Sequence, residues 1–265
     1  MTTSSAADVW NLGDYQQIAF ENVIVGERLC SALAIPAGAR VLDVACGTGN
    51  TALAAARRRA DVTGIDIASA LVERARRRAD AEGLATIAFQ TGDATTLPYA
   101  DNSFDFVLST FGAVFLPDQA ATARELARVV RPGGTIALTA WARQSLPSDV
   151  YHLVHSLVPP PENAPLPAFV WTDGSRAAEL FGPLCQSIVL RHDDVDACFA
   201  SAEAMFDNHA RNYGPVMTGL KRFTDEQRTG FRSGFIAACN RYNRATDGTM
   251  MARYDYATII AIKSA

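Results

Sequence analysis

The 265-residue sequence has few of the features that mark secreted, membrane-spanning or metal-stapled proteins. Cysteine is scarce and no two cysteines form a CxxC pair; the five are Cys30, Cys46, Cys185, Cys198 and Cys239. This scatter argues against a zinc site and a disulfide framework, and it favours a reducing compartment. No apolar run approaches membrane-spanning length, and segment 1–10 lacks the basic and apolar parts of a signal peptide. We therefore expect a cytoplasmic protein with no membrane span and no metal.

The chain also lacks a large excess of either positive or negative charge. The formal net charge is −4 and charged residues make up 20% of the chain, so no broad basic field for nucleic acid is indicated. Two arginine-rich runs, 57–59 and 74–78, fall late in expected helices, where cations complement the helix dipole. We interpret them as solvated helix faces. Apolar residues make up 49%, enough for one large α/β domain or a core domain with a cap.

Strand and helix patterns alternate through the first half of the chain. The expected strands are 39–45, 61–67, 86–90, 104–110 and 135–141, and the expected helices are 51–59, 69–82 and 119–130. Strands that are continuous apolar runs, separated by helices, indicate a parallel sheet covered on both faces. Ser69 is the expected N-cap of the second helix and Gly83 its stop. The segment 131–134 is expected to end the third helix.

The alternation breaks after residue 141. The proline-rich stretch 147–167 is expected to form a loop or lid, because proline disrupts regular helix. A further strand at 187–192, a mostly helical segment at 200–244 and a last strand at 254–263 follow. We expect a single domain, 1–265. Its cofactor-binding core spans about 30–143, 185–192 and 252–265, and its cap or lid spans about 1–29, 144–184 and 196–250.

The segment 41–50, VLDVACGTGN, is the clearest candidate site. Gly47 and Gly49 lie between the first expected strand and the first helix, at the carboxyl end of the strands, where open α/β sheets bind ligands. Glycine permits the tight turn and a close approach of ligand to backbone. The pattern predicts a site for an adenosine cofactor.

Three carboxylates lie at or near the carboxyl ends of three successive expected strands. Asp66 follows Gly47 by 19 residues and suits the hydroxyl groups of a ribose, and Asp93 suits an adenine amino group. Gly47-x-Gly49-x-x-Ala52 also satisfies the dinucleotide fingerprint, so an NAD(P)-dependent oxidoreductase is an alternative. However, Asp43 would oppose a pyrophosphate, whereas three carboxylates favour a cationic cofactor.

Ordered motifs extend beyond the glycine loop. They are DVACGTG at 43–49, GID at 64–66, GDA at 92–94, FDFV at 104–107 and RPGG at 131–134. In this order they resemble the motifs of class I S-adenosylmethionine-dependent methyltransferases, most closely the ubiquinone/menaquinone-methyltransferase-like branch acting on small molecules. The resemblance covers roughly residues 40–141. The flanks, including Trp10, Tyr15 and Trp171, resemble a bacterial subgroup more loosely, which suggests a role in bacterial secondary metabolism.

The resemblance implies a Rossmann-like, doubly wound sheet of seven strands, mostly parallel with an antiparallel last strand, plus a helical cap. It implies S-adenosylmethionine as the cofactor and a small molecule as the methyl acceptor. The glycine loop and Asp43 would hold the cofactor's amino-acid end, and Asp66 its ribose. The full set of implied cofactor-binding residues is Tyr15, Asp43, Ala45, Gly47, Gly49, Asp66, Ile67, Asp93, Ala94, Ser109 and Thr110.

No motif assigns a general base. His152 and His155 could share a helix face, Tyr15 and Tyr213 are further candidates, and the remaining histidines are His192 and His209. Aromatic side chains at strand ends or in the cap are candidates to enclose an apolar or aromatic acceptor: Phe111, Phe115, Tyr151, Phe169, Trp171, Phe206 and Tyr213. A cofactor-binding protein without catalysis remains a third hypothesis. The sequence indicates no oligomeric state.

Overall fold

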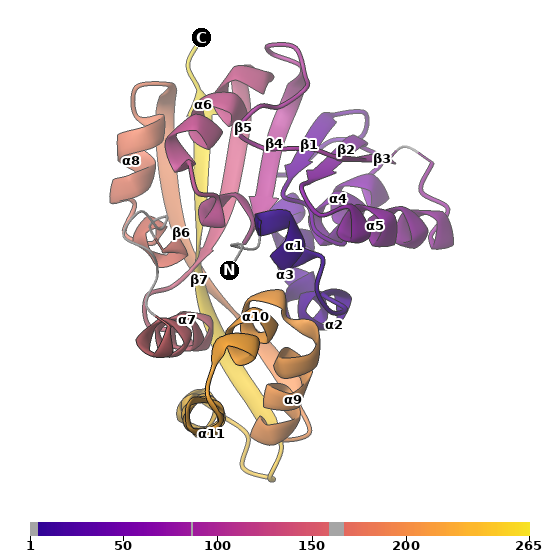
Figure 1. Ribbon diagram of the computed structural model, residues 1–265. Coiled ribbons are helices and arrows are strands. Elements are labelled where there is room, and N and C mark those ends of the chain that lie inside the picture. The colour runs from indigo at the N-terminus through magenta and orange to yellow at the C-terminus, as the bar shows by residue number, and fades with distance from the viewer. Residues whose placement is uncertain (1–4, 86, 159–166) are drawn as a thin grey trace. The chain divides into compact units, whose positions relative to one another are not determined.

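The computed structural model describes residues 5–85, 87–158 and 167–265 (Figure 1). The chain divides into two compact units. We call Val23–Ala140, Pro165–Asp193 and Ala257–Ala265 the sheet unit, and Met1–Asn22, Trp141–Ala164 and Asp194–Tyr256 the helical unit. Strands β6 (Cys185–Phe199) and β7 (Met250–Lys263) have residues in both units. Each unit is described separately below.

A seven-stranded sheet has the order β3-β2-β1-β4-β5-β7-β6. Its other strands are β1 (Arg40–Val44), β2 (Asp61–Asp66), β3 (Ile87–Thr91), β4 (Phe104–Thr110) and β5 (Val130–Trp141). The pairs β1–β2, β2–β3, β1–β4 and β4–β5 are parallel, and the last strand is antiparallel. The predicted fold class is therefore confirmed.

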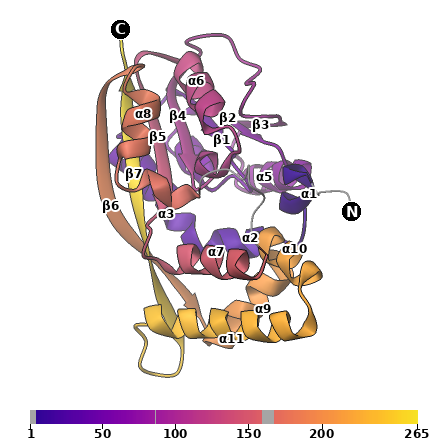
Figure 2. The same cartoon turned by 60° about the vertical axis from the view of Figure 1, so that its left-hand side comes forward.

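Alternation along β1 explains why both faces of this sheet are covered. Leu42 and Val44 point into one apolar cluster, whereas Val41 points into the other. The first cluster contains side chains of α6 (Gln119–Val129) and α8 (Ser175–Phe181), and the second contains side chains of α3 (Val23–Ala32), α4 (Asn50–Arg57) and α5 (Ser69–Ala81). Figure 2 shows α6 and α8 side by side, as their contacts require.

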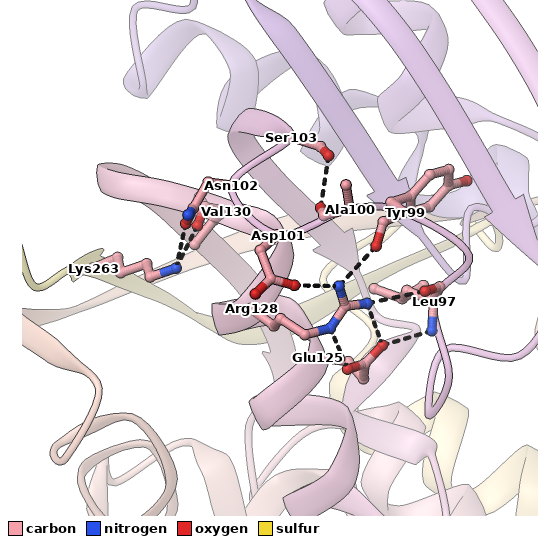
Figure 3. A network of polar contacts seen from close by, with 10 residues as sticks. All are labelled: Leu97, Tyr99, Ala100, Asp101, Asn102, Ser103, Glu125, Arg128, Val130 and Lys263. Carbon is pink, nitrogen blue, oxygen red and sulfur yellow. Dashed lines mark hydrogen bonds and ion pairs between the residues drawn. The ribbon is translucent and has the colours of Figure 1, made fainter.

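An arginine ties the loop before β4 to α6 (Figure 3). The Arg128 guanidinium bonds to the Glu125 and Asp101 carboxylates and to the Leu97 and Tyr99 carbonyl groups. At the end of β7, Lys263 Nζ donates to Asn102 Oδ1 and to the Val130 carbonyl, both at 2.8 Å. This network fixes the loop from several directions.

The helical unit contains most of the remaining helices. They are α1 (Ala6–Trp10), α2 (Gln16–Ala19), α7 (Leu146–Leu157), α9 (Ala202–Asn212), α10 (Gly214–Arg222) and α11 (Asp225–Tyr242). Short 3-10 helices are η1 (Phe20–Asn22) here, and η2 (Ala113–Phe115) and η3 (Ala168–Trp171) in the sheet unit. Phe206, Phe231 and Phe235 form an aromatic core between α9 and α11. Over the described residues, no helix is long and apolar enough to cross a membrane.

Most expected elements are present, with four corrections. The expected loop at 147–167 begins as α7, because Pro147 occupies the first helical turn, where its missing N–H has no helical partner to lose. The expected loop at Pro159–Pro161 lies outside the described residues. Strand β5 starts at Val130 and so includes segment 131–134, in which Gly133 has φ +67°.

The other two corrections concern a cap and a boundary. Ala68, not Ser69, is the N-cap of α5, whereas Gly83 ends the helix region with φ +64°, as expected. The expected cap segment 144–184 divides between the units: its described residues up to 158 belong to the helical unit and those from 167 to the sheet unit. The reason is that Trp171 of η3 and Phe181 of α8 are buried in the apolar cluster of the sheet that also contains side chains of α6. Treatment of the whole chain as one domain stays a prediction.

Candidate cofactor site

The turn from β1 into α4 adopts a backbone that needs left-handed residues. Gly47 has φ +53° and Gly49 has φ +87°, and even Ala45 has φ +52°. A non-glycine residue is rarely left-handed, so Ala45 is a strained position held by its surroundings. Gly49 is the N-cap of α4 and provides no side-chain cap. The cap residue of α4 therefore contributes no side-chain acceptor to the first amides of the helix.

Asp66 links the end of β2 to the glycine loop. Its Oδ2 accepts the Gly47 N–H at 2.8 Å, and its Oδ1 accepts the Ala68 N–H at 2.8 Å. The residue is only 7% exposed. Burial raises the pKa of the Asp66 carboxyl, and its bonds to backbone amides oppose that shift. The side chain therefore holds the loop while keeping further oxygen lone pairs for a hydroxyl donor.

Asp43 lies beneath the same loop. It is 1% exposed, and its Oδ2 accepts the Ala52 N–H of α4 at 2.9 Å. Burial, opposed by the Ala52 bond and assisted by the neighbouring Asp66 charge, raises the pKa of the Asp43 carboxyl to about 8. Two coupled carboxylates beneath one loop are stabilised in their charged form by a cation. An anionic pyrophosphate would have the opposite effect.

The residues present fit an adenosine cofactor that has cationic, anionic and hydroxyl groups. Asp43 and Asp66 supply acceptors for ammonium or ribose hydroxyl groups and negative charge for a sulfonium. The amino end of α4, where Gly49 supplies no capping side chain and Asp43 accepts the Ala52 N–H, suits a carboxylate, because helix N-termini bind anions. This combination matches the amino-acid and ribose parts of the cofactor implied by the motifs.

The predicted adenine-contacting residues lie at neighbouring strand ends. Ile67 directly follows β2 and is half-buried, and Ala94 follows β3 and is buried. Asp93 is exposed, and its Oδ1 accepts both the N–H and the hydroxyl of Thr95 at 2.8 Å. These two hydrogen bonds order the turn, and the second carboxylate oxygen of Asp93, Oδ2, takes part in neither.

Ser109 and Thr110 end β4, as predicted. The Ser109 hydroxyl donates to the Val44 carbonyl at 2.6 Å and accepts the Ala113 N–H at 2.8 Å. The Thr110 hydroxyl contacts the Thr51 hydroxyl of α4. Both side chains therefore brace the loop, and their expected contact with the methionine portion of the cofactor stays a prediction.

Two residues that the motifs do not include pack against the glycine loop. Arg78 of α5 donates to the Thr48 carbonyl at 2.6 Å and to Asn50 Oδ1 at 2.8 Å. Phe89 lies behind the loop, because a Cβ built on Gly49 or Gly64 would come within 3.0 Å or 2.5 Å of its ring. The ring explains why glycine is needed at position 64, deep in β2.

The interpretation of the arginine runs as solvated faces is wrong for Arg78. This residue is partly buried, and that burial lowers the pKa of its guanidinium. Arg57 is exposed, as interpreted, and pairs with Glu27 and with Glu82 of other segments. Helical position alone does not distinguish Arg78 from exposed neighbours such as Arg77.

Tyr15 and the candidate bases other than His192 belong to the helical unit. Tyr15 packs against Trp10 with ring centroids 5.6 Å apart, and against Tyr213 at 6.4 Å. His155 and His152 both lie on α7, and His155 Nδ1 is 2.8 Å from the Tyr151 carbonyl. The cofactor role of Tyr15 stays a prediction. Among the described residues, no His, Cys, Asp and Glu group is placed to hold a metal.

Comparisons with known proteins agree with these motifs. A family model described as a methyltransferase domain matches residues 41–134. An uncharacterized protein of Mycobacterium tuberculosis is 34% identical over 82% of this chain and 80% of its own length. Methyltransferase GfsG of Streptomyces halstedii is 42% identical over 42% of this chain and 41% of its own.

One solved structure of similar fold is the YcgJ protein of Bacillus subtilis. It has a TM-score of 0.61 at 22% identity and covers 91% of this chain and 99% of its own. This likeness concerns the fold alone, since a fold does not determine the reaction.

Proposed function

Because the chain belongs to the class I S-adenosylmethionine-dependent methyltransferases, we propose that it methylates a small apolar or aromatic metabolite. The observation that carries the proposal is the pair Asp43 and Asp66 beneath a left-handed glycine loop. Family membership decides between this cofactor and the dinucleotide of the oxidoreductase alternative.

The chain's residues have distinct parts in holding the cofactor. We propose that the loop amides around Gly47 and Gly49 bind its amino-acid end, with Asp43 as the buried counter-charge. Asp66 accepts the ribose hydroxyls, while Ile67, Asp93 and Ala94 surround the adenine. When bound, S-adenosylmethionine supplies a methyl group activated for in-line displacement.

The protein's catalytic contribution is alignment and desolvation. Ser109 and Phe111 are buried, and we propose that these side chains exclude water from the loop side of the site. Holding two reactants in line can account for a large part of a rate enhancement without a covalent step. A proton acceptor is required only for acceptors that must lose a proton, and the motifs assign none.

Part of the expected acceptor lining instead serves as core. Phe111, Phe169 and Trp171 are buried in the sheet unit, and Phe206 is buried in the helical unit. The apolar nature of the acceptor therefore rests on the predictions for Phe115, Tyr151 and Tyr213. A cytoplasmic location is proposed from the cysteines, all five of which are unpaired.

Two measurements test the proposal. Calorimetry should show binding of S-adenosylmethionine and of its demethylated product, but no binding of NADH. The proposal is contradicted if the folded protein binds neither S-adenosylmethionine nor the demethylated product. A panel of apolar, aromatic and polar acceptors is then incubated with methyl-labelled cofactor. Binding without transfer to any acceptor would favour the non-catalytic hypothesis instead.

A further inference from the structure

A buried carboxylate lies at the centre of the helical unit, away from every motif of the sequence. The Glu21 side chain of η1 is 6% exposed. Its Oε2 accepts the Tyr254 hydroxyl of β7 at 2.9 Å, and its Oε1 is 3.6 Å from His209 Nε2 of α9. Three segments that are far apart in the sequence thus converge on one acid.

The Glu21 carboxylate is incompletely satisfied. Within the described structure, Oε1 is buried and has no hydrogen-bond partner, because the His209 contact is too long for one. A buried carboxylate oxygen without a donor is costly, and a native structure that retains one calls for a reason. Burial also raises the pKa of Glu21, and the Coulombic effect of His209 and the hydrogen bonds of Tyr254 and Asn208 only partly oppose this shift.

A cavity of about 450 Å³ opens beside this acid. It is lined by Gln17, Phe20, Glu21, Asp196, Cys198, Phe199, Ala204 and Asn208, all in the helical unit. The volume lies in the range of small-molecule sites. Its lining contains two carboxylates, two amides and two phenylalanines, but no lysine or arginine among the described residues.

The two carboxylates of the cavity differ in their partners. Asp196 is ion-paired with Arg244, so its charge is already compensated. Glu21 has no arginine or lysine partner among the described residues; its contacts are the histidine, the Tyr254 hydroxyl and the Asn208 side chain. Phe20, which is 55% exposed, presents an unusually open aromatic surface at the same cavity. An acidic group at depth and aromatic walls together suit an organic cation.

We propose that this cavity binds a protonated organic amine, with its ammonium group on Glu21 and its apolar part against Phe20 and Phe199. The ammonium completes the unsatisfied Oε1 as a charge-assisted donor. Aromatic faces stabilise the cation and cover the apolar part. An anionic ligand is disfavoured by the same two carboxylates. The site rests only on contacts within the helical unit and does not depend on methyl transfer.

The test compares three ligands of similar shape by calorimetry on the full chain. Phenethylamine carries the cation, 2-phenylethanol is its neutral counterpart, and 3-phenylpropanoate is anionic. We expect the amine to bind most tightly. Glu21→Gln should weaken amine binding about tenfold and leave the alcohol unchanged, because it removes only the charge. Glu226→Gln, an exposed change in the same unit, is the matched control.

A second variant keeps the test decisive if Glu21→Gln does not fold. Ala204→Met narrows the cavity without touching the acid, and it should weaken the amine and the alcohol alike. Circular dichroism checks that each variant is folded. The proposal is overturned if phenethylamine shows no binding at millimolar concentration, if the anion binds as tightly, or if both variants retain native amine affinity.

Discussion

Buried carboxylates occur in both units, but they are held in different ways. In the sheet unit, Asp43 and Asp66 accept backbone N–H groups at most 19 residues away. In the helical unit, Glu21 is held by side chains, one of them 233 residues away. The contacts of Asp43 and Asp66 form within neighbouring segments of the β1–α4–β2 unit. The contacts of Glu21, in contrast, form only after three segments that are far apart in the sequence have packed together.

The largest effect is expected at the cofactor loop. Asp66→Ala removes the acceptor of two backbone amides and the proposed acceptor of the ribose hydroxyls. Since hydrogen bonds to a charged group contribute about 1.5–3 kcal/mol each, affinity for S-adenosylmethionine should fall about a hundredfold or more. Calorimetry measures it, and Asp61→Ala at the exposed start of the same strand is the control. Native affinity in Asp66→Ala would refute the assigned role.

Arg78→Met sharpens the comparison by testing support from outside the motifs. The variant loses the bonds to Thr48 and Asn50 but keeps an apolar side chain of similar length. We expect cofactor affinity to fall about tenfold, because the loop is no longer held in place. Arg77→Met changes an exposed neighbour on the same helix and should bind normally. Equal affinities for the two variants would show that Arg78 has no part in positioning the loop.

Stability should respond in opposite directions in the two units. Gly64→Ala places a Cβ 2.5 Å from the Phe89 ring and should destabilise the protein by about 1–3 kcal/mol. Gly230→Ala in α11 meets nothing within 4 Å and should stabilise it by up to about 1 kcal/mol. Urea unfolding measures both. Adding Phe89→Leu should rescue Gly64→Ala in part, and a strictly additive double variant would contradict the packing argument.

A pH dependence of stability is expected from Asp43. Its pKa is 3.8 in the unfolded chain and about 8 when folded, so the folded state holds the proton more tightly. Stability is therefore lost as pH rises between these two values. Asp43→Asn lacks this titration, and relative to it the wild type should lose roughly 2–4 kcal/mol between pH 5 and pH 8. Parallel pH profiles of unfolding for the two proteins would exclude the effect.

The same contrast explains how much could be predicted from the sequence. Strands such as 104–110 and the glycine loop depend on local periodicity and turn chemistry, and they agree with the structure. The helix at Leu146–Leu157 agrees with the helix face suggested for His152 and His155, but its start falls in a stretch expected to be a loop or lid, because Pro147 is compatible with a first helical turn. The bracing by Arg78 and the convergence on Glu21 leave no periodic signal, because both depend on side chains brought together by packing.

The glycine loop above Asp43 and Asp66 is the proposed cofactor site. A crystal structure with S-adenosylhomocysteine, the demethylated product, tests it most directly. We expect the ribose hydroxyls to donate to the Asp66 carboxylate, and the amino-acid end to contact the Gly47–Gly49 backbone and the start of α4. A ligand bound elsewhere, or a ribose out of reach of Asp66, would contradict it.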